Sequence, residues 1–118
     1  MIKLIELEDE YNLQAMKQGE YPREILDSAN RVIIILTQSW CPDWWAQKLV
    51  FKDIEDTGEI KVYYVDYGNK SFRAEFTSFK ETVFRNGHIP YLRFYRDGEL
   101  EKESNYTGRR ELKKWLES

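Results

Sequence analysis

The only cysteine of the chain, Cys41, stands in the stretch ILTQSWCPDWWAQKLVF, residues 35–51. An apolar run ends just before it and a helical pattern begins just after it, so Cys41 is expected at a helix N-terminus. There the unpaired N–H groups and the positive end of the helix dipole favour a thiolate over a thiol. Asp43 opposes this effect, because a nearby carboxylate disfavours a second negative charge. The residues alone leave open whether Cys41 is a reactive thiol or a small buried hydrophobe.

The sole histidine, His88, lies two residues before Pro90 and is a second candidate for thiol chemistry. Cysteine and histidine form a common nucleophilic pair, but we expect His88 to be a solvated loop residue. A structural zinc site needs about four protein ligands, usually Cys and His, and the chain offers one of each. We therefore expect no metal. We also expect no cofactor, since no glycine-rich phosphate loop is evident.

The composition is that of one globular domain. The chain has 118 residues, of which 42% are apolar and 33% are charged, and a single core suffices at this size. Its net charge of −3 argues against nucleic-acid binding, which usually requires a basic excess. Basic residues do cluster in residues 108–118, but acidic residues interrupt them, and we interpret the cluster as a solvated helix face.

Cysteine usage and hydropathy indicate the compartment. A single cysteine excludes an internal disulfide and suits a reducing environment. The first residues lack the apolar region of a signal peptide, and no window approaches the ~18 apolar residues of a membrane helix. We expect a soluble, cytoplasmic protein that binds no membrane.

Hydrophobic periodicity predicts alternating strands and helices in the first part of the chain. Residues 31–37 contain consecutive β-branched residues, which is typical of a central strand buried on both faces. A second strand, rich in Val and Tyr, is expected at 60–66, and a short edge strand at 2–7. Helices are expected after Pro22 and from residue 42 to about 56. This alternation favours parallel strands with helices on both faces of the sheet.

The last part of the chain adds a helix, a hairpin and a final helix. Apolar residues at steps of four, three and four predict a helical stripe made of Phe72, Phe76, Phe79 and Val83. Asp97-Gly98 predicts a tight turn between strands at 91–95 and 99–103. The C-terminal helix is expected to bury Leu112, Trp115 and Leu116. The predicted fold class is α/β, with a central mixed sheet flanked by helices on both faces, in one domain of residues 1–118.

These segments, taken in order, resemble the thioredoxin superfamily. IIILTQSWCPDWW is similar to its strand that runs into Trp-Cys-x-x-Cys, and HIPYLRFYRDGEL is similar to its Ile-Pro pair followed by a hairpin. The resemblance covers nearly the whole chain and implies a thioredoxin-like fold. It also implies that Cys41, after Trp40, is the nucleophile. Pro90 then matches the cis-proline, which follows Ile89 and faces the sulfur.

The resemblance implies, in addition, a groove beside Cys41 that receives extended segments of other proteins. Aromatic residues are favoured at such interfaces because they bury a large area with few torsions. Helical spacing places Trp45 with Leu49 on the core side. The residues expected to line the groove are Trp40, Trp44, Ile89, Pro90 and Tyr91.

Two positions depart from the superfamily pattern. Trp44 replaces the second cysteine, and Ile35 replaces the acidic residue often found six positions before the nucleophile. The dithiol cycle is therefore excluded. One hypothesis is exchange through Cys41 alone, with a thiol of another protein or a small thiol such as glutathione as the second reactant. The alternative is a non-catalytic protein-binding module that has lost redox turnover. The CPDW motif differs from the Cys-Gly-Phe-Ser of cluster-binding monothiol glutaredoxins, which disfavours an iron–sulfur site.

Overall fold

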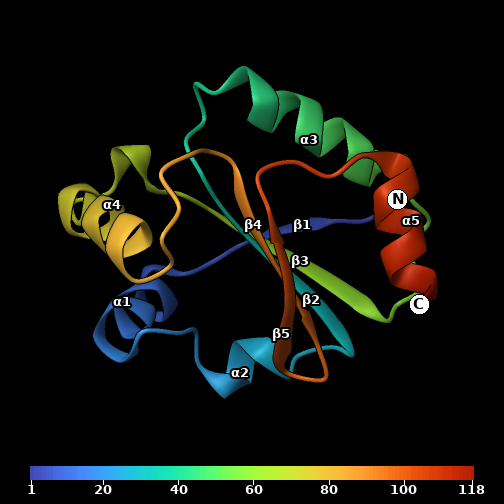
Figure 1. The fold of residues 1–118 in the computed structure, drawn as a ribbon, viewed down its shortest axis with the longest axis horizontal. Helices are drawn as coiled ribbons and strands as arrows, with labels where there is room; N and C mark the ends of the chain where they lie inside the picture. The colour runs from blue at the N-terminus through green and yellow to red at the C-terminus, as the bar shows by residue number, and fades with distance from the viewer.

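The computed structural model describes all 118 residues and centres on one five-stranded sheet (Figure 1). The strand order is β1-β3-β2-β4-β5. The first three strands run parallel, whereas β4 is antiparallel to both of its neighbours, so the predicted mixed sheet is confirmed. The strands are β1 (Leu4–Glu6), β2 (Arg31–Thr37), β3 (Ile60–Asp66), β4 (Tyr91–Arg96) and β5 (Glu99–Ser104).

Helices cover both faces of this sheet, as Figure 1 shows. Helices α1, α2 and α4 pack on one face, and α3 and α5 pack on the other. None of them is long and apolar enough to cross a membrane. The helices are α1 (Asp9–Gln18), α2 (Arg23–Leu26), α3 (Pro42–Lys52), the short 3-10 helix η1 (Tyr67–Asn69), α4 (Arg73–Thr82) and α5 (Arg109–Glu117).

Strand β2 lies at the centre of the sheet, and all of its residues are buried. Ile33 and Ile35 face α3 and α5, whereas Val32 and Ile34 face the opposite layer. A strand covered on both faces has no polar side to show, which explains its continuous apolar run. Because β2 and β4 are antiparallel neighbours, the residues that follow β2 and those that precede β4 lie at the same end of the two strands.

The buried face of helix α3 differs from the predicted one. Trp45 and Leu49 are 57% and 56% exposed, so their expected core position is wrong. Trp44 is only 3% exposed and takes that place. The spacing of apolar residues predicted the wrong face because a polar residue, Gln47, belongs to the buried face. The side-chain amide of Gln47 exchanges two hydrogen bonds with the backbone of Thr107, at 2.8 and 3.0 Å, which satisfies it in the core.

Helix α4 buries the three phenylalanines of the predicted apolar stripe, but it ends before Val83, the last residue of that stripe. Val83 is 51% exposed, and the next residue, Phe84, is buried in its stead. The backbone N–H groups of both residues donate to the Phe79 carbonyl, so the last turn widens and the helix stops. Arg85 then adopts a left-handed conformation with φ of 55°, which turns the chain away from the helix axis.

The hairpin and the terminal helix form as predicted. Asp97 and Gly98 have φ values of 50° and 81°, which is the left-handed pair that a tight hairpin turn requires. Glycine removes the steric cost of this conformation at the second position. In α5, Leu112 and Trp115 are buried and Leu116 is half-buried, so this helix closes the layer that also contains α3.

Candidate functional site

Cys41 is the N-cap residue of helix α3. Pro42 follows as the first helical residue, where its missing N–H has no intrahelical partner to lose. The Cys41 carbonyl accepts the backbone N–H groups of Trp44 and Trp45 at 3.1 and 3.3 Å. The helix therefore begins directly after the cysteine, as its sequence predicts.

The loop before β4 brings Ile89 and Pro90 against Cys41. The peptide bond between Ile89 and Pro90 is cis, and the Cys41 thiol donates a hydrogen bond to the Ile89 carbonyl with an Sγ to O distance of 3.6 Å. Cys41 follows β2 and Pro90 precedes β4, so the antiparallel pairing of these strands makes the two segments neighbours. The site joins residues that are 48 positions apart in the sequence.

Apolar side chains surround the sulfur. Cys41 is 5% exposed and belongs to the cluster that includes Ile35 and Trp44. Asp43 and His88 are both exposed, and the only hydrogen bond of His88 comes from its backbone N–H, not from its ring. No group of three or more His, Cys, Asp and Glu side chains is placed to hold a metal ion. The thiol thus has one polar partner, the Ile89 carbonyl.

Two exposed tryptophans flank the cysteine. Trp40 is 65% exposed, and its indole N–H donates to Gln38 Oε1 at 2.7 Å. The indole N–H of Trp45 donates to the Ser39 carbonyl at the same distance. Since both N–H groups are bonded to the chain itself, the rings are oriented in advance and present apolar faces to solvent.

The aromatic surface therefore differs in composition from the predicted one. Trp44 is buried, with its ring 5.6 Å from that of Tyr64, and Tyr91 has no exposed surface. Their expected exposure is wrong, because α3 turns Trp44 inward and β4 directs Tyr91 toward α4. Trp45, which the sequence placed in the core, is exposed like Trp40, and its indole is bonded to Ser39, the residue before Trp40.

Comparison with known proteins settles the fold. No protein-family model matches the chain, and no curated protein matches it. Solved structures do match. Thioredoxin O1 from Arabidopsis thaliana, in its oxidized state, is 16% identical with a TM-score of 0.64, over 97% of this chain and 95% of that one. A mutant thioredoxin from Halobacterium salinarum is 15% identical with a TM-score of 0.63, over 97% and 86% of the two chains. The chain has the thioredoxin fold.

Within this thioredoxin fold, two asparagines fix the loop that carries Ile89 and Pro90. Asn86 and Asn105 exchange two side-chain hydrogen bonds, at 3.0 and 2.9 Å. Asn105 also donates to the Pro90 carbonyl at 2.9 Å, and Asn86 accepts the backbone N–H of His88 at 3.0 Å. The sequence analysis gave neither asparagine a place in the site, because neither residue is part of a recognisable motif.

Lys80 of α4 holds the same loop from beneath. Its side chain is 2% exposed, and Nζ donates to the Asn86 carbonyl at 2.8 Å. Burial lowers the pKa of Lys80 to about 8. The Nζ atom also lies 5.7 Å from the centre of the Tyr91 ring, whose quadrupole favours a nearby cation.

The opposite face of the thioredoxin-fold sheet holds a buried charge that the sequence analysis missed. Arg93 donates to the hydroxyl groups of Tyr91 and Tyr95, at 2.8 and 2.7 Å, and forms an ion pair with Glu20 at 2.7 Å. Tyr95 donates to Glu20 at 2.7 Å, and Tyr91 donates to Glu103. We call these five residues the Arg93 network. Burial raises the pKa of both tyrosines, so their hydroxyls stay protonated as donors.

Proposed function

We propose that this protein carries out thiol–disulfide exchange through Cys41 alone, with an external thiol as the second reactant. The observation that carries the proposal is the contact between the N-cap cysteine of α3 and the carbonyl before the cis-proline, 3.6 Å from Sγ to Ile89 O. The thioredoxin fold of the chain makes protein disulfides the natural class of substrate.

The reaction needs two thiol exchanges. The Cys41 thiolate attacks one sulfur of a partner disulfide, the S–S bond breaks, and the second sulfur leaves as a thiolate that takes up a proton. Cys41 is then joined to the partner as a mixed disulfide. With no second cysteine in the chain, an external thiol such as glutathione attacks that bond, releases Cys41, and becomes disulfide-bonded to the partner in its place.

The neighbouring residues have distinct proposed roles in this reaction. Ile89, which is half-buried, would contact the backbone of the partner segment, because its carbonyl lies next to the reacting sulfur. Pro90, which was expected to line the groove, is buried and would hold Ile89 in place. Trp40 would supply apolar contact area from the other side of Cys41. The bond from the thiol to the Ile89 carbonyl must break before attack, since a thiolate has no proton to donate.

A turnover assay tests the proposal. A glutathione-modified peptide is mixed with the protein and excess reduced glutathione. In this substrate the Cys41 thiolate attacks the glutathione sulfur and the peptide leaves as a free thiol; reduced glutathione then frees Cys41 and departs as glutathione disulfide. Release of the free peptide is followed with time. The wild-type protein is expected to accelerate release, whereas Cys41→Ser is expected to match the uncatalysed rate. Equal rates for the two proteins would refute catalysis by Cys41.

A second candidate function is binding of partner proteins without redox turnover. The observation that favours it is the pair of exposed, oriented indoles of Trp40 and Trp45, together with the exposed Leu49. Tryptophan is enriched among the residues that dominate interface energies. In this case, peptides selected for binding to the wild-type protein would bind Cys41→Ser equally and Trp45→Ala weakly. Loss of binding in Cys41→Ser would argue against it.

A further inference from the structure

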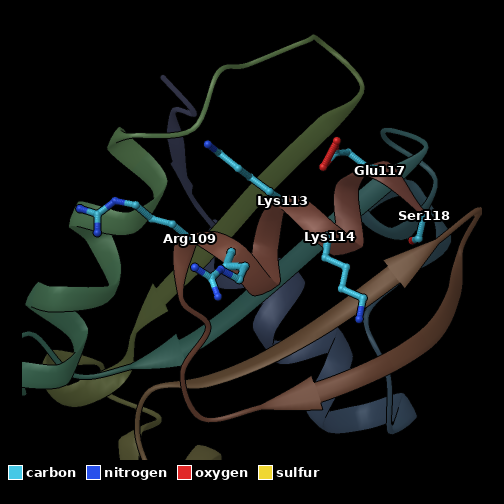
Figure 2. Close-up of a pocket in the computed structure, with 6 residues that line it drawn as sticks. Arg109, Lys113, Lys114, Glu117 and Ser118 are labelled. Atoms are coloured by element: carbon cyan, nitrogen blue, oxygen red, sulfur yellow. The ribbon is translucent and has the colours of Figure 1, made fainter.

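The outer face of helix α5 is strongly basic. Figure 2 shows its side chains projecting from one helix in several directions. They border a wide-open surface depression of about 840 Å³. We call this surface the α5 basic face. The residues that line it are Arg109, Arg110, Lys113, Lys114, Glu117 and Ser118.

Charge is unevenly divided between this face and the rest of the molecule. The face contains four of the 18 basic residues and one of the 21 acidic residues. That leaves 14 basic and 20 acidic residues elsewhere, a net charge of −6 outside a face of +3. A concentration of one sign on an oppositely charged protein orients and attracts partners of complementary charge.

Most of these cations have no partner within the chain. Arg109 is the exception, since its guanidinium is bonded to Asp53 at the end of α3, with Nε at 2.7 Å from Oδ2. Arg110, Lys113 and Lys114 are exposed and form no ion pair or hydrogen bond. The stability of the fold therefore does not account for them, because the packing of α5 uses its other side, Leu112 and Trp115.

We infer that the α5 basic face binds an acidic, extended segment of a partner protein. Arg110 and Lys114 are separated by one helical turn, a rise of about 6 Å. Alternate side chains of an extended peptide lie about 6.6 Å apart, so carboxylates at every second position match this spacing. Arg109, held against Asp53, fixes the end of the face that borders α3.

Other anionic partners fit the surface less well. A long polyanion such as nucleic acid would extend beyond the α5 basic face onto a surface with a net charge of −6, which repels it. A membrane surface calls for apolar side chains beside the basic ones. This face has none, because the apolar residues of α5 are in the core. A short acidic segment avoids both difficulties.

The test uses a fluorescent peptide in which Glu and Ser alternate, with anisotropy as the readout. The wild-type protein is expected to bind it at low salt and to lose affinity as salt screens the charges. The double variant Lys113→Gln/Lys114→Gln is expected to bind about 2- to 30-fold more weakly, from about 0.2–1 kcal/mol for each exposed charge. The matched control is Lys3→Gln/Lys17→Gln, which removes the same charge from exposed residues elsewhere, and it should bind like the wild type.

Several results would overturn the inference. Equal affinity of the two double variants for the peptide would show that the α5 basic face does not bind it. Tighter binding of a single-stranded oligonucleotide or of anionic vesicles than of the peptide would assign the face to those ligands. Self-association that is lost in Lys113→Gln/Lys114→Gln would identify a second copy as the partner. Peptide binding should be unchanged in Cys41→Ser, so failure here is distinguishable from failure of the proposed exchange reaction.

Discussion

The two faces of strand β4 differ in how fully their buried polar groups are hydrogen-bonded. On one side, Tyr91, Arg93 and Tyr95 project into a buried network in which every donor has a carboxylate or hydroxyl partner. On the other side, Leu92 belongs to the apolar cluster around Cys41. The Cys41 thiol has a single, long hydrogen bond to a backbone carbonyl.

This difference suggests separate roles for the two faces, stability for the Arg93 network and thiol chemistry for Cys41. A buried ion whose partners are all satisfied is costly to disturb, since loss of one partner leaves other groups desolvated and unpaired. A thiol with one weak bond can leave it at little cost and react. The Arg93 network is therefore interpreted as structural, and the end of β2 that carries Cys41 is where we propose the exchange reaction.

The largest expected effect comes from Arg93→Met. It leaves the Glu20 carboxylate and two tyrosine hydroxyls without their buried partner, and should lower the free energy of unfolding by about 3–5 kcal/mol. Urea denaturation measures the change. The control is Arg96→Met on the same strand, where a partly exposed ion pair with Glu101 predicts a loss under about 1 kcal/mol. Equal losses of unfolding free energy in the two variants would show that the Arg93 network stabilises the fold no more than an exposed ion pair does.

The two adjacent tryptophans of α3 offer a second contrast. Trp44→Ala leaves a cavity under Cys41 and should cost about 3 kcal/mol or more in unfolding free energy. Trp45→Ala removes an exposed ring and should change stability by about 0.5 kcal/mol or less. If Trp45→Ala were the more destabilising variant in the same urea titration, the orientation of α3 would be wrong.

The lowered pKa of Lys80 predicts that the stability of the fold changes with pH. The unfolded chain holds the Lys80 proton up to about pH 10.4, whereas in the folded protein the pKa is about 8. Between these values the unfolded state binds more protons, so stability rises with pH, by on the order of 2 kcal/mol from pH 8 to 10. Above pH 10 the raised pKa of Tyr91 and Tyr95 reverses the trend, because unfolded tyrosines ionise first.

The check is urea denaturation across this pH range. Lys80→Met is expected to lose the rise between pH 8 and 10 while it keeps the fall above pH 10. A rise of the same size in the variant would assign the effect to other groups.

The smallest expected effect comes from Asn105→Ala, which removes the bonds to Asn86 and Pro90. Stability should fall by about 1 kcal/mol. The loop that covers Cys41 would also be less restrained, so alkylation of Cys41 in the folded protein should be faster than in the wild type. The control, Asn69→Ala, removes an exposed asparagine of η1 and should leave the rate unchanged.

The regular parts of the fold could be predicted from the sequence, and the reasons are local. The β-branched run of β2 and the Asp97-Gly98 turn each have a backbone preference that the tertiary structure keeps. The meeting of Cys41 with Ile89 followed from the resemblance and from the order of the strands, and the two residues do lie in contact.

Features that depend on buried polar groups could not be predicted. Gln47 has the side chain of a surface residue, but its bonds to Thr107 satisfy it on the buried side of α3, the side that also carries Trp44. Arg93 likewise reads as a solvent-facing residue of an alternating strand. Its burial depends on Glu20, 73 positions away, and no local pattern contains that pairing.

The most direct test of the central claim is the reaction of the native protein with glutathione disulfide, followed by mass spectrometry. We predict a mixed disulfide on Cys41 that forms without denaturant and is reversed by reduced glutathione, with Cys41→Ser unmodified. Modification that requires denaturant would mean that the sulfur is sealed in the core. It would contradict exchange through Cys41 and leave the exposed tryptophans as the functional surface.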